Sequence, residues 1–132
     1  MKVEEKKDIL EFLLFDECFN IFHFAAQFAH QMSIFEFLWL KIKSHLDVDD
    51  NLKKLLNLKD SQGANALILS IYGKNTMTFN LLFEEIYCKH FDVKDFIYEA
   101  DKDGDNFFHN LVKFGTVQML QSGTKKLKDE LP

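Results

Sequence analysis

The sequence predicts an all-α protein made of about three helix–turn–helix units that pack side by side. Two observations favour this fold. One local pattern, an Asn followed by two apolar residues and a short apolar stretch, occurs at Asn20, Asn65 and Asn106. Each stretch ends at a small or polar break and is followed by a second stretch with apolar residues on one helical face. Because a unit of this kind cannot bury its own apolar face, the units must cover one another.

Each unit is expected to open with a turn and a helix N-cap. In the second and third units an Asp precedes a Gly by three residues, and that Gly, Gly63 or Gly104, suits a backbone conformation that other residues avoid. The Asn of each unit, Asn20, Asn65 or Asn106, is a preferred N-cap residue. A first helix of about two turns should follow each Asn.

The chain of 132 residues is long enough for one domain, which we expect to span residues 1–132. The second helix of each unit is expected to follow the break. The units are predicted to cover approximately residues 15–45, 57–90 and 98–122.

Four segments lie outside the units. Residues 4–14 place apolar residues at helical spacing opposite charges, which predicts a capping helix over the first unit. The junctions at 46–56 and 91–97 are each expected to add a helical turn capped by Asp. The polar tail, 123–132, either frays or forms a closing helix.

These residues resemble the ankyrin repeat, whose pattern is Asp-x-x-Gly-x-Thr-Pro-Leu-His-x-Ala-Ala-x-x-Gly-His. Residues 101–109 with Gly115 match the pattern, and residues 20–30 match its helical half. The likeness covers roughly residues 15–122. It departs in two ways: the Pro of the pattern is missing from every unit, and the units are about ten residues longer than the family's period of about 33.

The resemblance implies an ankyrin-type solenoid with structural residues at fixed places. His23 and His109 fall on the family's hydrogen-bonding histidine. The residues expected to have structural roles are Asn20, His23, Gly63, Asn65, Gly104, Asn106, His109 and Gly115.

The resemblance also implies a concave surface that binds a protein partner through the turn tips and the exposed ends of the inner helices. The aromatic residues at these places either line that surface or fill gaps in an irregular core. The candidate protein-binding residues are Asp16, Glu17, Phe19, Gln27, Phe28, Ser61, Gln62, Tyr72, Lys102, Asp103, Asp105, Lys113 and Phe114.

The composition argues against several other classes. The net charge is −5 and all 16 basic residues are Lys, which disfavours direct binding to nucleic acid. Cys18 and Cys88 cannot form a disulfide framework, and the N-terminus has no signal-peptide pattern, so we expect a cytoplasmic or nuclear protein that is not secreted. No apolar run is long enough to span a membrane.

No catalytic constellation, cofactor motif or zinc spacing is present in the sequence, so a non-enzymatic protein without cofactors is expected. The segment from Asp101 to Asp105 resembles the opening of a calcium loop. However, the sixth and twelfth places hold Asn106 and Val112 instead of Gly and Glu. The turn of the repeat explains these residues better than calcium binding does.

The sequence therefore predicts a protein–protein interaction module. A second expectation follows from the resemblance. The short, irregular units look like those of ankyrin proteins related to the inhibitors of Rel/NF-κB transcription factors. That resemblance would imply a protein that sequesters Rel factors and suppresses immune signalling, and an acidic module would suit a basic partner surface.

Overall fold

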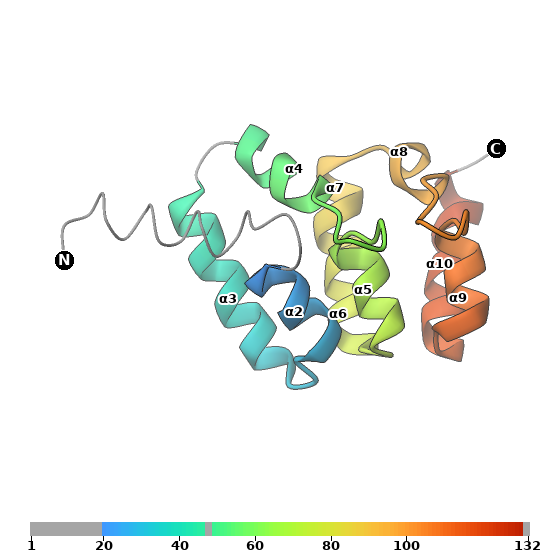
Figure 1. Ribbon diagram of the computed structural model, residues 1–132, viewed down its shortest axis with the longest axis horizontal. Helices are drawn as coiled ribbons and strands as arrows, with labels where there is room; N and C mark the ends of the chain where they lie inside the picture. The colour runs from blue at the N-terminus through green and yellow to red at the C-terminus, as the bar shows by residue number, and fades with distance from the viewer. Residues whose placement is uncertain (1–19, 47–48, 131–132) are drawn as a thin grey trace.

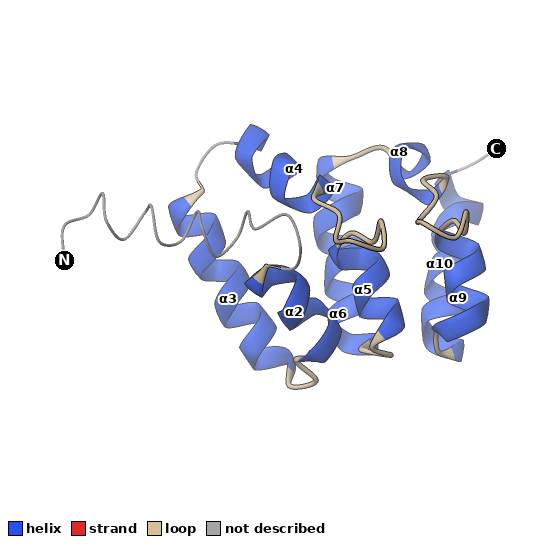
Figure 2. Ribbon diagram, in the orientation of Figure 1, coloured by secondary structure: helices blue, strands red, loops and turns tan. Residues whose placement is uncertain are grey.

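The computed structural model describes residues 20–46 and 49–130, and all regular structure in these ranges is helical (Figures 1 and 2). The prediction of an all-α chain is therefore confirmed for this part of the chain. None of the helices within these ranges has the length and apolar character needed to cross a membrane. The predicted capping helix at 4–14 lies outside the described residues, as do Asp16, Glu17 and Phe19.

The helices form three pairs in a row. The first helix of each pair is α2 (Ile21–Phe28), α5 (Ala66–Tyr72) or α9 (Phe107–Phe114). The second is α3 (Met32–His45), the continuous run of α6 (Thr76–Asn80), η1 (Leu81–Tyr87) and α7 (Cys88–His90), or α10 (Val117–Glu130). Helix α5 packs between α2 and α9, and α6 packs between α3 and α10, so the pairs build two layers (Figure 1).

The first helices begin where the sequence pattern predicts because three Asn side chains form their N-caps. The side chains of Asn20, Asn65 and Asn106 accept hydrogen bonds from the backbone N–H three residues later, at 2.7, 2.9 and 3.0 Å respectively. Each bond satisfies one of the N–H groups that a helix start leaves without a partner.

The two junctions each contain a short helix, as predicted. Helix α4 (Asp49–Asn57) joins the first pair to the second, and α8 (Val93–Ile97) joins the second pair to the third. The Asp92 side chain caps α8 by accepting from the backbone N–H of Lys94. These segments account for the extra length of the units.

The polar tail is not a separate element in the structure. Of the two forms left open for it, the helical one is present, and α10 runs through Gly123 without a break. A Cβ at Gly123 would lie 3.0 Å from a Leu111 methyl carbon and 3.2 Å from the Phe107 ring. The missing side chain at Gly123 thus lets α10 lie close to α9 past the expected boundary at residue 122.

Aromatic side chains dominate the core between the second and third pairs. Phe83 lies 5.5 Å from Phe79 and 5.2 Å from Phe107, measured between ring centroids, with the rings nearly parallel. Tyr87 is fully buried, and its hydroxyl donates to the Leu56 carbonyl at 2.6 Å. The core therefore connects α4 and the third pair to the η1 helix of the second pair.

In the second and third pairs, the eighth residue after the N-cap Asn contacts the preceding pair. At the eighth position, Gly73 lies against the preceding pair's Gln27, and the Phe114 ring contacts the preceding pair's Tyr72. In the first pair, the residues at the first, fourth and eighth positions keep large exposed fractions. They are Ile21 (42%), Phe24 (55%) and Phe28 (49%).

Candidate interaction surface

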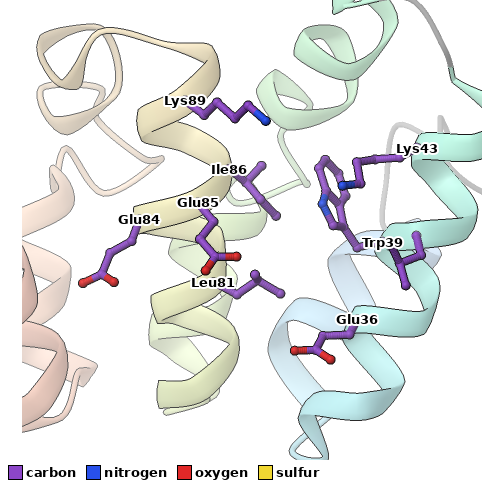
Figure 3. A pocket seen from close by; sticks show the side chains of 9 residues that line it. Glu36, Trp39, Lys43, Leu81, Glu84, Glu85, Ile86 and Lys89 are labelled. Atoms are coloured by element: carbon purple, nitrogen blue, oxygen red, sulfur yellow. The ribbon is translucent and has the colours of Figure 1, made fainter.

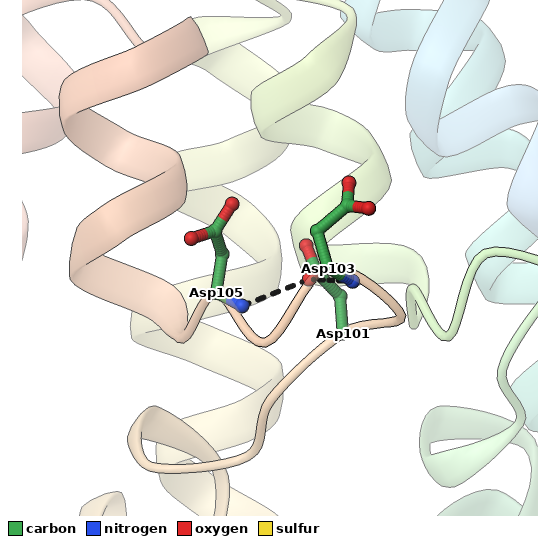
Figure 4. A group of neighbouring side chains, drawn as sticks. All are labelled: Asp101, Asp103 and Asp105. Carbon is green, nitrogen blue, oxygen red and sulfur yellow. Dashed lines mark hydrogen bonds between the residues drawn. The ribbon is translucent and has the colours of Figure 1, made fainter.

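The turns before α5 and α9 have the same hydrogen-bond pattern. One carboxylate oxygen of Asp60 accepts from the backbone N–H of Gln62 and Ala64, at 2.9 and 3.0 Å. One oxygen of Asp101 accepts from the equivalent N–H groups of Asp103 and Asp105, also at 2.9 and 3.0 Å (Figure 4). The pattern makes each turn a preformed element.

Each turn requires a glycine for its backbone conformation. The two turns are also hydrogen-bonded to each other. Gly63 and Gly104 have φ angles of +77° and +82°, in the left-handed region that other residues avoid. The backbone N–H of Lys102 donates to the Gln62 carbonyl at 2.9 Å. A Cβ at Gly63 would lie 3.0 Å from the Lys102 nitrogen. The turn tips therefore form one continuous edge.

Asp101 also connects the third turn to two helices. Its second carboxylate oxygen accepts from the Tyr72 hydroxyl at 3.0 Å and from the Asn110 side-chain amide at 3.1 Å. Burial alone would raise the pKa of Asp101, but the hydrogen bonds from Asp105, Asn110, Tyr72 and Asp103 outweigh it and lower the pKa. The ionised carboxylate in turn fixes the orientation of the Tyr72 ring. Burial and this hydrogen bond raise the pKa of Tyr72.

The carboxylates of Asp101, Asp103 and Asp105 come close enough to be considered as a cation site, with oxygens within 4.8 Å of one another. However, four N–H and O–H donors already bond the Asp101 oxygens. Asp105 is paired with Lys113, whose pKa its hydrogen bond raises. These bonds explain the acidic cluster as the framework of a turn and give the calcium alternative no support.

Tyr72 and Phe114 form an aromatic pair at the ends of α5 and α9. Their ring centroids are 5.2 Å apart and the rings meet edge to face. Tyr72 is half-buried, whereas Phe114 is 42% exposed. The Lys74 ammonium group donates to the Phe114 carbonyl and so connects the same two helices. The pair is thus held on rigid elements with one ring open to solvent.

The structure distributes the other candidate binding residues along this surface. Phe28 does not contact the Tyr72–Phe114 pair but packs on Phe24, with ring centroids 4.8 Å apart. Gln27 contributes its backbone carbonyl, which abuts Gly73. The residues exposed on the turns or beside them are Ser61, Gln62, Lys102, Asp103 and Lys113.

The two histidines at equivalent sequence positions differ in their surroundings. His23 is fully buried, and its Nε2 atom lies 3.0 Å from the Leu58 carbonyl oxygen. His109 is exposed, and its Nδ1 atom accepts from the backbone N–H of Asn106 in a capping box. The difference follows from position in the row, because Leu58 leads into the next pair and the described residues contain no pair after the third.

Replacing His23 with Gln is expected to weaken the pH dependence of stability below neutral pH. Burial lowers the pKa of His23, so the folded chain binds its proton more weakly than the unfolded chain does. The free energy of unfolding should therefore fall as the pH drops below the unfolded-state value of about 6.5, until the lower folded-state pKa is reached.

Urea unfolding of the wild type and His23→Gln between about pH 5.5 and 7.5, above the carboxylate range, measures this difference. The comparison at the upper pH isolates any cost of the substitution itself, since His23 is neutral there in both states. Identical slopes for the two proteins over this range would contradict a buried neutral His23.

The sequence pattern does not reveal Asn75, which connects the first two pairs. Asn75 is buried, and its side-chain amide donates to the carbonyls of Ala29 and Ala26, at 2.8 and 3.2 Å, at the end of α2. The hydroxyls of Thr76 and Thr116, 3.0 Å apart, make a similar link between the second and third pairs. In the sequence, the only indication of these links is a polar residue directly after the break that ends each first helix.

Comparisons with known proteins give no indication of function, so the function is inferred from the geometry of the structure. No protein-family model, curated protein or solved structure matches the chain.

Proposed function

We propose that the chain is a non-enzymatic module that binds another protein through the surface made by α2, α5, α9 and the two turns. The observation that supports this most directly is the Tyr72–Phe114 pair, in which one aromatic ring is open to solvent beside hydrogen-bonded turns. Large aromatic side chains contribute much of the binding energy in protein interfaces. The row of helix pairs with bonded turn tips is what an ankyrin-type solenoid would provide.

Preorganisation supports the same proposal. The Tyr72 ring is held by Asp101, and the turn that contains Asp101 is bonded to its neighbour through Lys102 and Gln62. A surface that is ordered before binding loses less conformational entropy when the partner arrives. The exposed Asp103 carboxylate near Tyr72 favours a partner segment with an apolar anchor and a basic flank.

Replacing both Tyr72 and Phe114 with Ala is expected to abolish capture of binding proteins from cell extract, because it removes the aromatic anchor. Val112→Ala is the matched control: Val112 lies on the same helix as Phe114, is 74% exposed and is not part of the ring pair. Quantitative mass spectrometry of captured proteins, with circular dichroism to verify folding, makes the comparison.

Tyr72→Phe separates the roles of the ring and the hydroxyl. It keeps the aromatic contact with Phe114 and removes the bond to Asp101, so capture should be reduced but retained. If the double variant is folded and captures the same proteins in the same amounts as Val112→Ala, the proposed surface is wrong.

A further inference from the structure

A groove lies in the second layer of helices, away from the aromatic pair. It has a volume of about 590 Å³ and separates α3 from the η1–α7 helix (Figure 3). Its apolar lining consists of Trp39, Leu81 and Ile86, which are nearly buried, and Leu40, which is 61% exposed at the rim. A groove of this size and lining is typical of a binding site.

One wall of the groove has an unusual backbone. Residues Leu81–Tyr87 form a π-helix of seven residues, and four of them line the groove. A π-helix widens each turn by bonding to the fifth residue along the chain, and such segments are rare and frequent at functional sites. Helix α3 packs against α6, below this segment, and is separated from η1 where the groove opens (Figure 3).

The charges around the groove are separated by sign. Glu36 and Glu85 lie toward one end, and Lys43 and Lys89 lie at the other, whereas the Glu84 side chain extends away from α3 (Figure 3). In the ranges 20–46 and 49–130, none of these five groups has an opposite charge within 4.0 Å. The Lys43 ammonium group lies 5.9 Å from the Trp39 ring. These charges therefore remain available to a partner.

We propose that this groove binds one amphipathic α-helix of a partner protein. The apolar side chains of that helix lie on Trp39 and Leu40, its basic end lies beside Glu36 and Glu85, and its acidic end lies beside the two lysines. Two neighbouring helices with an apolar groove between them are a known site for a third helix. From Glu36 to Lys43 the wall is about 10 Å long at 1.5 Å per residue, which matches two helical turns.

Trp39 is the only tryptophan of the chain and therefore a direct probe of the groove. The test uses the full chain and a synthetic helix without Trp or Tyr. The peptide has two lysines at one end, leucines at positions i, i+3, i+4 and i+7, and two glutamates at the other end. Titration is expected to change the intensity of Trp39 emission in a saturable manner, because pairing of Lys43 with the peptide alters the charge beside the ring, and to remove the small acrylamide quenching that its 7% exposed fraction allows.

Leu40→Glu is expected to weaken peptide binding at least tenfold, because it places a charge against the apolar face of the peptide. Ile34→Glu is the matched control on the same helix. Ile34 is 52% exposed and does not line the groove, so this variant should bind as the wild type does. A peptide with glutamates at both ends should bind at least fivefold more weakly, since one end meets Glu36 and Glu85.

Several results would overturn the proposal. One is no saturable response of Trp39, and another is equal weakening by Leu40→Glu and Ile34→Glu. A third is a Leu13→Glu variant that increases acrylamide quenching of Trp39 without peptide, which would mean that the chain's own N-terminal segment fills the groove. A fourth is a dimer in sedimentation that Leu40→Glu dissociates, which would make a second copy the occupant.

Discussion

Replacing Gly73 with Ala is expected to destabilise the protein by about 3 kcal/mol or more. A Cβ at this position would lie 1.9 Å from the carbonyl oxygen of Gln27 and 2.8 Å from its carbonyl carbon. Because the neighbour is backbone, no side-chain rotation can relieve the overlap, and α5 must move away from α2. Urea unfolding followed by circular dichroism measures the loss.

Gly104→Ala provides the control for this experiment. Gly104 has a φ of +82°, but an added Cβ there would meet no atom within 4 Å. The substitution should cost only the backbone strain of a left-handed Ala, about 1–2 kcal/mol. A cost for Gly73→Ala no larger than that for Gly104→Ala would show that α2 and α5 are not in the close contact described.

Phe107→Ala is expected to cost about 3–5 kcal/mol and to loosen the third helix pair from the second. Phe107 is 1% exposed, and its ring centroid lies 5.2 Å from that of Phe83 and 6.0 Å from that of Phe79. Truncation leaves a cavity between α9 and η1 that the rigid neighbours cannot fill. The midpoint of urea unfolding reports the loss of stability.

Phe37→Ala is the matched aromatic control. Phe37 is 63% exposed on α3, and its ring makes a cation–π contact with Lys41 at 5.4 Å. Its loss should change the free energy of unfolding by no more than about 0.5 kcal/mol. If the two Phe substitutions have equal effects, Phe107 does not belong to the core between the pairs.

The local parts of each unit could be predicted because they depend on residues three or four positions apart. An Asn followed by an apolar stretch is enough to predict the cap that Asn65 makes. The Asp60 and Asp101 turns follow from the Asp–Gly spacing in the same way. The added helix at Val93–Ile97 follows from Asp92 and the apolar residues after it. Nothing outside the segment is needed to form these elements.

The contacts between pairs could not be predicted, because they depend on packing between distant segments. The pattern gives His23 and His109 the same role, yet only His23 has a following pair to bond. The π-helix at Leu81–Tyr87 gives no signal in the apolar spacing, which fits an ordinary helical face. The groove beside it depends on the separation of two helices that are about 45 residues apart in the chain.

The aromatic residues show where the sequence leaves two interpretations open. A phenylalanine at a helix end can serve the core or a binding surface, and spacing alone does not distinguish the two. Tyr72 and Phe114 join two helices and still leave one ring open to solvent. Phe28 instead packs on Phe24 of its own helix.

The apolar positions that face along the row also make the molecule extensible. At the sixth position after the Asn, Ala26 and Ile71 are fully buried within the row, whereas the equivalent Val112 is 74% exposed. An engineered pair fused after the third pair would thus meet an exposed apolar side chain at a position where the first two pairs have a buried one. A row of helix pairs can be lengthened in this way because each added pair packs only on its neighbour and does not have to fit into a closed core.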